Sequence, residues 1–266
     1  MNDRPHDQNY RLAVCVLASG SKGNAIYISD GDTTILVDAG LSGREIERRL
    51  HSRGLTPDTL DAIVVSHEHS DHIKGAGVLS RRYQIPVYMS SGTHAGSGSQ
   101  LGKPHQIIFF SCGTTFQIGA LTLHPFSTSH DAREPAGFTV NQNGVKIGIA
   151  TDLGISTGMV KEHLKHCTLL ILEANHDPAM LIDGPYPWHL KQRVKGRTGH
   201  LSNEDSRQLL DEVQHKHLRF VILAHLSEVN NLPEIARQVV GEVLPGPRTQ
   251  LSVATQYQSG DVFLLP

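Results

Sequence analysis

Short apolar runs alternate along the chain with stretches in which apolar residues recur every three or four positions. Runs rich in Val, Ile and Leu that end at Gly, Asp or Ser predict β-strands, and the periodic stretches predict amphipathic helices. Strands are predicted over 12–17, 25–29, 33–37, 62–65, 86–89, 107–110, 121–125, 138–141, 145–150, 168–172 and 219–224. Helices are predicted over 159–165, 203–215 and 232–243.

Local signals and the order of the elements indicate the fold class. Ser42 is placed to cap a helix over 43–54, and Asn143 with the glycine after it is a strong hairpin signal. Two successive sets of strands and helices indicate two sheets packed face to face with helices outside, a four-layer αββα arrangement. No change in composition marks a linker, so we expect one domain over 1–266, with 1–10 as a flexible tail.

The composition argues against several classes of protein. The 266 residues include 24 basic and 26 acidic side chains, for a net charge of −2, which is untypical of a protein that binds nucleic acid by bulk positive charge. A nuclease is not excluded, because bound divalent cations can attract phosphate locally. Cys15, Cys112 and Cys167 are too few and too widely spaced for a disulfide framework. Neither a membrane span nor a signal peptide is evident, so a cytoplasmic protein without a membrane partner is expected.

One segment concentrates residues that bind metals. The apolar strand ending at Val65 runs into Ser66-His67-Glu68-His69-Ser70-Asp71-His72. His67 and His69 can both face one cation from an extended loop, while Asp71 and His72 reach a second position. Imidazoles and carboxylates suit zinc and its first-row neighbours. The alternative is a His-rich loop on the surface.

Single His or Asp residues follow four other apolar runs. They are Asp38, His130, Asp152 and His225. Any one of them alone is more often a cap or a satisfied polar group than a ligand. Together they repeat one design, a polar side chain at the end of a strand.

These residues resemble the metallo-β-lactamase fold superfamily, whose HxHxDH motif is matched by residues 67–72. The resemblance implies a four-layer αββα sandwich with a dimetal site at the edge of the two facing sheets. It implies two divalent ions, Zn²⁺ or Mn²⁺, with Fe²⁺ also compatible. It also implies that Asp38 orients the ligand loop without binding a metal itself. The implied ligands are His67, His69 and His130 for one metal, Asp71, His72 and His225 for the other, and Asp152 between them.

Within the superfamily the sequence is most similar to the WalJ/YycJ-like proteins. The similarity rests on the segments 17–24, 37–42, 67–75, 128–132 and 199–204. It implies an intracellular, metal-dependent enzyme that degrades DNA from the 5′ end, with a metal-bound hydroxide as the nucleophile. It also implies that Asp71 is essential for catalysis. The native metal, the oligomeric state and the choice of DNA over RNA are not fixed by the sequence.

Further candidates lie beside the ligands. Glu173 and His200 resemble the carboxylate and histidine of tRNA 3′-processing members of the superfamily, where such a histidine can protonate a leaving alkoxide. The alternative is that Glu173 merely ends a strand and that His200 merely precedes the helix cap at Ser202.

Two segments offer groups that could bind substrate. In the loop 19–24, Ser19, Ser21 and Asn24 can donate to a phosphate, or the loop can simply join two strands. In the basic run 186–197, Lys191 and Arg193 can line a nucleic-acid track, although such runs are more often solvated surface.

Three functions compete at this point. The first is a dimetal phosphodiesterase that acts on DNA, and the second is a dimetal hydrolase of a small thioester, lactone or cyclic phosphodiester. The third is a regulatory protein whose metals only stabilise the fold. A nuclease is expected to lose activity steeply as salt rises, because its phosphate contacts are screened.

Overall fold

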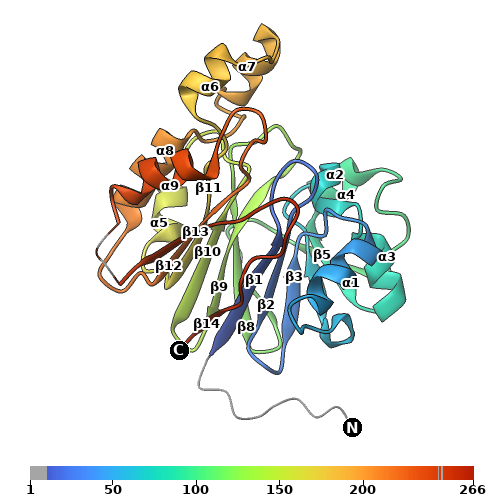
Figure 1. The fold of residues 1–266 in the computed structure, drawn as a ribbon. Coiled ribbons are helices and arrows are strands. Elements are labelled where there is room, and N and C mark those ends of the chain that lie inside the picture. The colour runs from blue at the N-terminus through green and yellow to red at the C-terminus, as the bar shows by residue number, and fades with distance from the viewer. Residues whose placement is uncertain (1–10, 245, 247) are drawn as a thin grey trace.

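The computed structural model describes residues 11–244, 246 and 248–266, and its strands form two seven-stranded sheets (Figure 1). One sheet has the order β14 (Phe263–Leu265), β1 (Leu12–Ala18), β2 (Ala25–Ser29), β3 (Thr34–Val37), β4 (Ala62–Val64), β5 (Pro86–Ser90), β6 (Gln106–Phe110). The other has the order β13 (Gln250–Val253), β12 (Phe220–Ala224), β11 (Leu169–Glu173), β10 (Val145–Ala150), β9 (Ala136–Gln142), β8 (Leu121–Ser127), β7 (Phe116–Ile118). The expected tail, 1–10, lies outside the described residues, and the expectation of one domain stays a prediction.

The two sheets share one pattern of strand directions. From β14 through β1 and β2 to β3 the neighbours are antiparallel, and from β3 to β6 they are parallel. In the same way, neighbours from β7 to β10 are antiparallel and neighbours from β10 to β13 are parallel. The carboxyl ends of neighbouring parallel strands lie together, which is where binding sites form in open α/β sheets.

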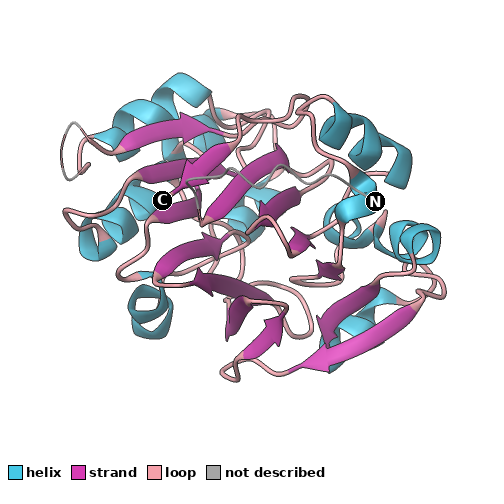
Figure 2. Cartoon of the chain, turned by 90° about the horizontal axis from the view of Figure 1, so that it is seen from below, coloured by secondary structure: helices cyan, strands magenta, loops and turns pink. Residues whose placement is uncertain are grey.

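Three apolar cores separate the layers. Alternate residues of β1 face opposite ways: Leu12, Val14 and Val16 join the core between the sheets, while Cys15 and Leu17 join an outer core. Because both faces of each sheet are apolar, both must be covered. Figure 2 shows the helices outside the sheets, which confirms the four-layer αββα arrangement.

The helices divide between the two outer faces. The first sheet is accompanied by α1 (Gly43–His51), α2 (Ser70–Ile73), α3 (Ala76–Tyr83), α4 (Ser91–Ser97) and the 3-10 turn η1 (Pro57–Thr59). The second is covered by α5 (Gly158–Leu164), α8 (Asn203–Val213) and α9 (Pro233–Gly241), whereas α6 (Pro178–Asp183) and α7 (Trp188–Val194) project beyond the sheets (Figure 1). Among the described residues, no helix has the length and apolar character needed to cross a bilayer.

The local signals in the sequence act as expected. The side chain of Ser42 accepts a hydrogen bond from the Glu45 amide at the start of α1. Asn143 and Gly144 both have positive φ, at 49° and 86°, as a two-residue hairpin of type I′ requires. All the predicted strands are present, with ends that shift by one or two residues.

The elements that the sequence did not predict are short or poorly encoded. They are α2, α3, α4, α6, α7, η1, β7, β13 and β14. α4 consists largely of Ser and Gly, which are weak helix formers, and it depends on a cap from Ser90. β14 pairs with β1 across almost the whole sequence, and no local pattern encodes such a pairing.

The two phenylalanines at the end of β6 test how much the core between the sheets contributes to stability. Phe110 is 6% exposed and stacks on Phe116, whereas its neighbour Phe109 is 56% exposed. We expect Phe110→Ala to lower the free energy of unfolding by about 3 to 5 kcal/mol. The matched Phe109→Ala should change it by no more than about 0.5 kcal/mol. Urea unfolding of the metal-loaded protein measures both, and equal losses would contradict this description of the core.

Candidate metal centre

Three polar residues that follow strands lie close together, and each has an uncommon backbone conformation. Asp38 directly follows β3, Asp152 lies just beyond β10, and His225 directly follows β12. Their φ angles are 61°, 55° and 56°, in the left-handed region that residues other than glycine rarely adopt. Such strain persists only where the surrounding structure holds it, and it collects at functional sites.

The segment after β4 is clamped by backbone hydrogen bonds. The Ala39 amide donates to the His72 carbonyl at 2.7 Å, and the Asn24 amide donates to the Asp71 carbonyl at 2.8 Å. A Cβ atom at Gly40 would lie only 1.6 Å from that Asp71 oxygen, so this position requires glycine. The clamp holds the turn into α2 and so fixes which side chains face the site.

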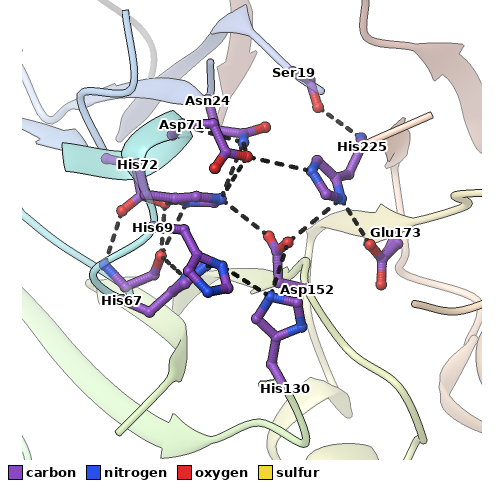
Figure 3. A network of polar contacts seen from close by, with 12 residues as sticks. Ser19, Asn24, His67, His69, Asp71, His72, His130, Asp152, Glu173 and His225 are labelled. Carbon is purple, nitrogen blue, oxygen red and sulfur yellow. Dashed lines mark hydrogen bonds and ion pairs between the residues drawn. The ribbon is translucent and has the colours of Figure 1, made fainter. Parts of the chain in front are cut away.

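Three histidine nitrogens face one another at the first candidate position (Figure 3). His67 Nε2 lies 3.1 Å from His69 Nδ1, which lies 3.3 Å from His130 Nε2. Nitrogens bound about 2.0 to 2.1 Å from a tetrahedral zinc ion are about 3.3 Å apart. The spacing therefore fits a cation among the three rings.

A second group lies beside the first. Asp71 Oδ2 is 3.5 Å from His72 Nε2 and 3.8 Å from His225 Nε2. Asp152 stands between the groups, with Oδ2 3.3 Å from His72 Nε2 and Oδ1 3.7 Å from His130 Nε2. Asp152 Oδ2 and His225 Nε2 are buried and have no hydrogen-bond partner among the described residues. Buried polar atoms without partners are costly, and a cation would satisfy both.

Acceptors behind the rings fix which nitrogen faces the site. The Nδ1 of His72 donates to Asp38 at 2.8 Å, and that of His225 donates to Glu173 at 2.8 Å. The Nδ1 of His130 donates to the Gly199 carbonyl at 3.2 Å. In each case the acceptor at Nδ1 turns Nε2 toward the site, which is how proteins orient histidine ligands.

The electrostatics of the site also call for positive charge. Burial holds the pKa of His67 well below its usual value, so this ring is neutral and able to bind a metal. Burial alone would also lower the pKa of His72, but the carboxylates of Asp38 and Asp152 outweigh it and hold that pKa well above normal. Protons or cations must therefore balance the buried carboxylates.

Glu173 connects the ligands to His200. It is fully buried at the end of β11, and its Oε1 accepts from His200 Nδ1 at 2.7 Å and from His225 Nδ1 at 2.8 Å. Its Oε2 accepts from the backbone amides of Leu153 and Leu201. Burial raises the pKa of Glu173, but the two imidazoles more than offset it, so the net shift is downward. The predicted pair of Glu173 and His200 is therefore in contact, through an ionised carboxylate.

An open cavity of about 300 Å³ leads to these residues. Ser21, Arg193 and His200 line it, and Lys191 does not. Five of the candidate ligands also line it: His69, Asp71, His130, Asp152 and His225. Lys191 instead donates to the backbone oxygen of Ile182. The predictions that Ser21, Arg193 and Lys191 bind substrate are not tested by these contacts.

The other two candidates in the β1–β2 loop are turned inward. Ser19 accepts a 2.7 Å hydrogen bond from the His225 amide, and Asn24 Nδ2 lies 3.3 Å from Asp71 Oδ2 and 3.0 Å from His72 Nε2. Both side chains are buried. In this structure they support the metal centre instead of facing the cavity, and their contact with substrate stays a prediction.

Sequence reasoning did not single out Asp131. Its Oδ2 accepts from two nitrogens of Arg193, at 2.6 and 2.7 Å, and its Oδ1 is 3.4 Å from His130 Nε2. The available signal was its position directly after His130. The ion pair with Arg193 joins residues far apart in the sequence, which a local pattern does not reveal.

Comparison with known proteins agrees with the fold. Residues 33–225 match the beta-lactamase superfamily domain. The chain is 39% identical over 235 residues to exodeoxyribonuclease YycJ of Bacillus anthracis, a match that covers 88% of this chain and 89% of that protein. It is 36% identical over 229 residues to exodeoxyribonuclease WalJ of Streptococcus pneumoniae serotype 2 (strain D39 / NCTC 7466), covering 85% of each.

A solved structure extends the agreement in fold. The metallo-beta-lactamase fold protein YhfI from Bacillus subtilis superimposes with a TM-score of 0.73 at 18% identity, over 94% of this chain and 99% of that one. The chain belongs to the metallo-β-lactamase superfamily and, within it, to the group of YycJ- and WalJ-like proteins. It is a metal-dependent hydrolase that uses divalent metal.

Asp38 offers a test of how the site is held. We expect Asp38→Asn to weaken metal binding by about 10- to 100-fold, because His72 loses the ionised acceptor that orients it. Titration of the metal-free protein with Zn²⁺ against a competing chelator measures the change. The matched variant is Asp211→Asn, an exposed carboxylate on α8, which should bind metal as the wild type does. Equal affinity in both variants would contradict the orienting role of Asp38.

Proposed function

We propose that the protein is an exonuclease that uses two divalent ions, Zn²⁺ or Mn²⁺, to degrade DNA from the 5′ end. The observation that carries the proposal is the pair of adjacent ligand groups that share Asp152 and open into a cavity beside His200 and Arg193. The names of the two relatives, exodeoxyribonucleases that match most of this chain, support DNA as the substrate.

The assignment of ligands follows from the two groups of facing atoms. His67, His69 and His130 hold the first ion, and Asp71, His72 and His225 hold the second. Asp152 contacts both groups and serves both ions. A pair of divalent ions, when bound, lowers the pKa of water and stabilises charge on the oxygens of a phosphodiester.

His200 supplies the proton that the leaving group needs. Its Nδ1 is engaged by Glu173, so Nε2 is the nitrogen available to substrate, and its side chain is 21% exposed at the cavity. A histidine oriented in this way by a carboxylate can hold a proton at Nε2 and donate it to the departing sugar oxygen. The same carboxylate stabilises the charged ring before the transfer.

Arg193 is placed to bind the phosphate at the mouth of the cavity. Asp131 holds the guanidinium through two contacts, which reduces the freedom that the arginine would lose on binding. The planar guanidinium matches phosphate oxygens in a way that a lysine ammonium does not. Ser21 on the opposite loop provides a hydroxyl at the same cavity. We retain Lys191, Ser19 and Asn24 only as possible further contacts.

Digestion of end-labelled linear DNA tests the proposed function. The purified protein is loaded with Mn²⁺ or Zn²⁺ and compared with a His67→Ala/His69→Ala variant purified in the same way. We expect stepwise loss of the 5′ label by the wild type, a rate that falls steeply with salt, and no loss by the variant. Asp71→Ala should be equally inactive and should lack the second metal.

Two outcomes would each contradict a different part of this proposal. Loss of a 3′ label first would overturn the polarity and leave the nuclease in place. No digestion by a preparation that holds two ions per chain would overturn the nuclease, and a small thioester, lactone or cyclic phosphodiester would become the substrate to test.

Two variants separate the proton donor from its carboxylate. His200→Ala should keep both metals but slow turnover by about a hundredfold, the usual scale for a lost general acid. Glu173→Gln should slow turnover and also weaken the second metal, since Glu173 contacts both His200 and His225. Metal content by mass spectrometry and rates on labelled DNA distinguish the two patterns.

The control for this pair is Glu162→Gln, which removes an exposed carboxylate from α5. It should retain both metals and the wild-type rate. Full activity in a two-metal His200→Ala protein would remove His200 from the mechanism.

A further inference from the structure

The segment 178–197, which contains α6 and α7 and is called the arm below, stands above the sheets on the side of the cavity (Figure 1). α7 buries none of its residues, whereas α8 buries a whole face against the second sheet. A helix that contributes so little to a core is not explained by packing.

The two sides of α7 differ in what they face. Tyr186, Leu190 and Val194, spaced four apart, line the cavity. Trp188 lies about 200° around the helix from Leu190. It is 66% exposed, and Lys195 holds its ammonium 5.2 Å from the centre of the indole ring. The inner side closes the metal cavity, while the outer side presents an aromatic ring and a cation to solvent.

The arm also carries a local charge that the rest of the chain does not share. Lys191, Arg193, Lys195 and Arg197 fall within residues 184–203, which contain no acidic residue, although the whole chain has a net charge of −2. Lys195 and Arg197 are exposed. An exposed aromatic ring beside cations is the combination that binds single-stranded nucleic acid: bases stack on the ring while phosphates meet the charges.

We propose that the arm binds a single strand of DNA, with an unpaired base stacked on Trp188 and the backbone held by Lys195 and Arg197. This inference rests on the proposed function, because the strand held by the arm is the substrate that reaches Arg193 and the metal centre. Inside a duplex the faces of the paired bases are already stacked, so only unpaired nucleotides and the last pair of a duplex offer a free face. The arm therefore favours unpaired DNA over duplex.

Trp188 is the only tryptophan in the chain, so it reports on its own contact. The metal-loaded wild-type protein is titrated with an oligothymidylate of about 12 nucleotides, within the range of single-strand sites, whose phosphorothioate linkages resist hydrolysis. We expect strong quenching of the tryptophan fluorescence that saturates with binding. A duplex of the same length should quench much less.

Variants of the arm test the same contact by anisotropy of a labelled strand. Trp188→Ala should weaken binding about tenfold or more, and Trp188→Phe should restore much of the loss because a ring remains. Lys195→Gln/Arg197→Gln should reduce the slope of log affinity against log salt by about 1.4, for two lost phosphate contacts. Circular dichroism and metal content establish that each variant is folded.

Matched controls lie at the opposite end of the molecule. Leu264 is 52% exposed on β14 and pairs with Ala13 near the start of β1, whereas Ser19 beyond the end of β1 reaches the site. Lys216 and Arg219 are exposed cations that precede β12, whereas His225 follows it. Leu264→Ala and Lys216→Gln/Arg219→Gln should leave the affinity and its salt dependence as in the wild type.

The outcomes separate this inference from the proposed function. Digestion of DNA by the wild type, without quenching of Trp188 and with unchanged affinity in Trp188→Ala, overturns the arm as a binding surface and leaves the nuclease. Quenching and a weakened Trp188→Ala variant, without digestion by a two-metal protein, support the arm and overturn the nuclease. Equal quenching by duplex and single strand overturns the preference for unpaired DNA.

Discussion

The burial of several imidazole nitrogens and carboxylate oxygens against one another is the constraint on which the rest of the site depends. In the first group three ring nitrogens face each other at 3.1 to 3.3 Å. Beside it, one oxygen of Asp152 and one nitrogen of His225 are buried with no hydrogen-bond partner in the described part of the chain. Such an arrangement is unfavourable unless positive charge lies among these atoms. The left-handed residues Asp38, Asp152 and His225 bring these side chains together, and the gain from satisfying them offsets the local strain.

A single carboxylate couples metal binding to proton transfer. Glu173 shares Oε1 between His225, a proposed ligand, and His200, the proposed acid, while backbone amides anchor its other oxygen. Full burial keeps water from competing for it. The two imidazoles in turn favour its ionised form, as the downward shift of its pKa records. One buried carboxylate thus contacts both rings, although His200 and His225 come from two separate segments of the chain.

How much of the fold and the candidate site the sequence could predict depends on how far apart in the sequence the contacting residues lie. Candidate ligands such as Asp152 could be proposed because each follows an apolar strand, and the ends of parallel strands meet at one edge of a sheet. The pairing of Glu173 with His200 was open from the sequence and is present in the structure. The link between Asp131 and Arg193 could not be found, since its residues are 62 positions apart and no local pattern joins them. The arm was visible only as a basic run, because α7 is seven residues long and its apolar residues Leu190 and Val194 line the cavity instead of a core.

The two sheets repeat one order of strand directions, yet their loops contribute differently. The loops of the first sheet supply the HxHxDH segment and its clamp, built from backbone contacts that tolerate little change, as the close approach at Gly40 shows. The segments after the strands of the second sheet supply Asp152, the Glu173–His200 pair, His225 and the arm. The arm is not independent of the site, because the Val194 carbonyl accepts a hydrogen bond from the His200 amide and Arg193 pairs with Asp131. The contacts proposed for a long substrate lie mainly on α7, which buries no residue, whereas the proposed metal ligands follow strands of the two sheets.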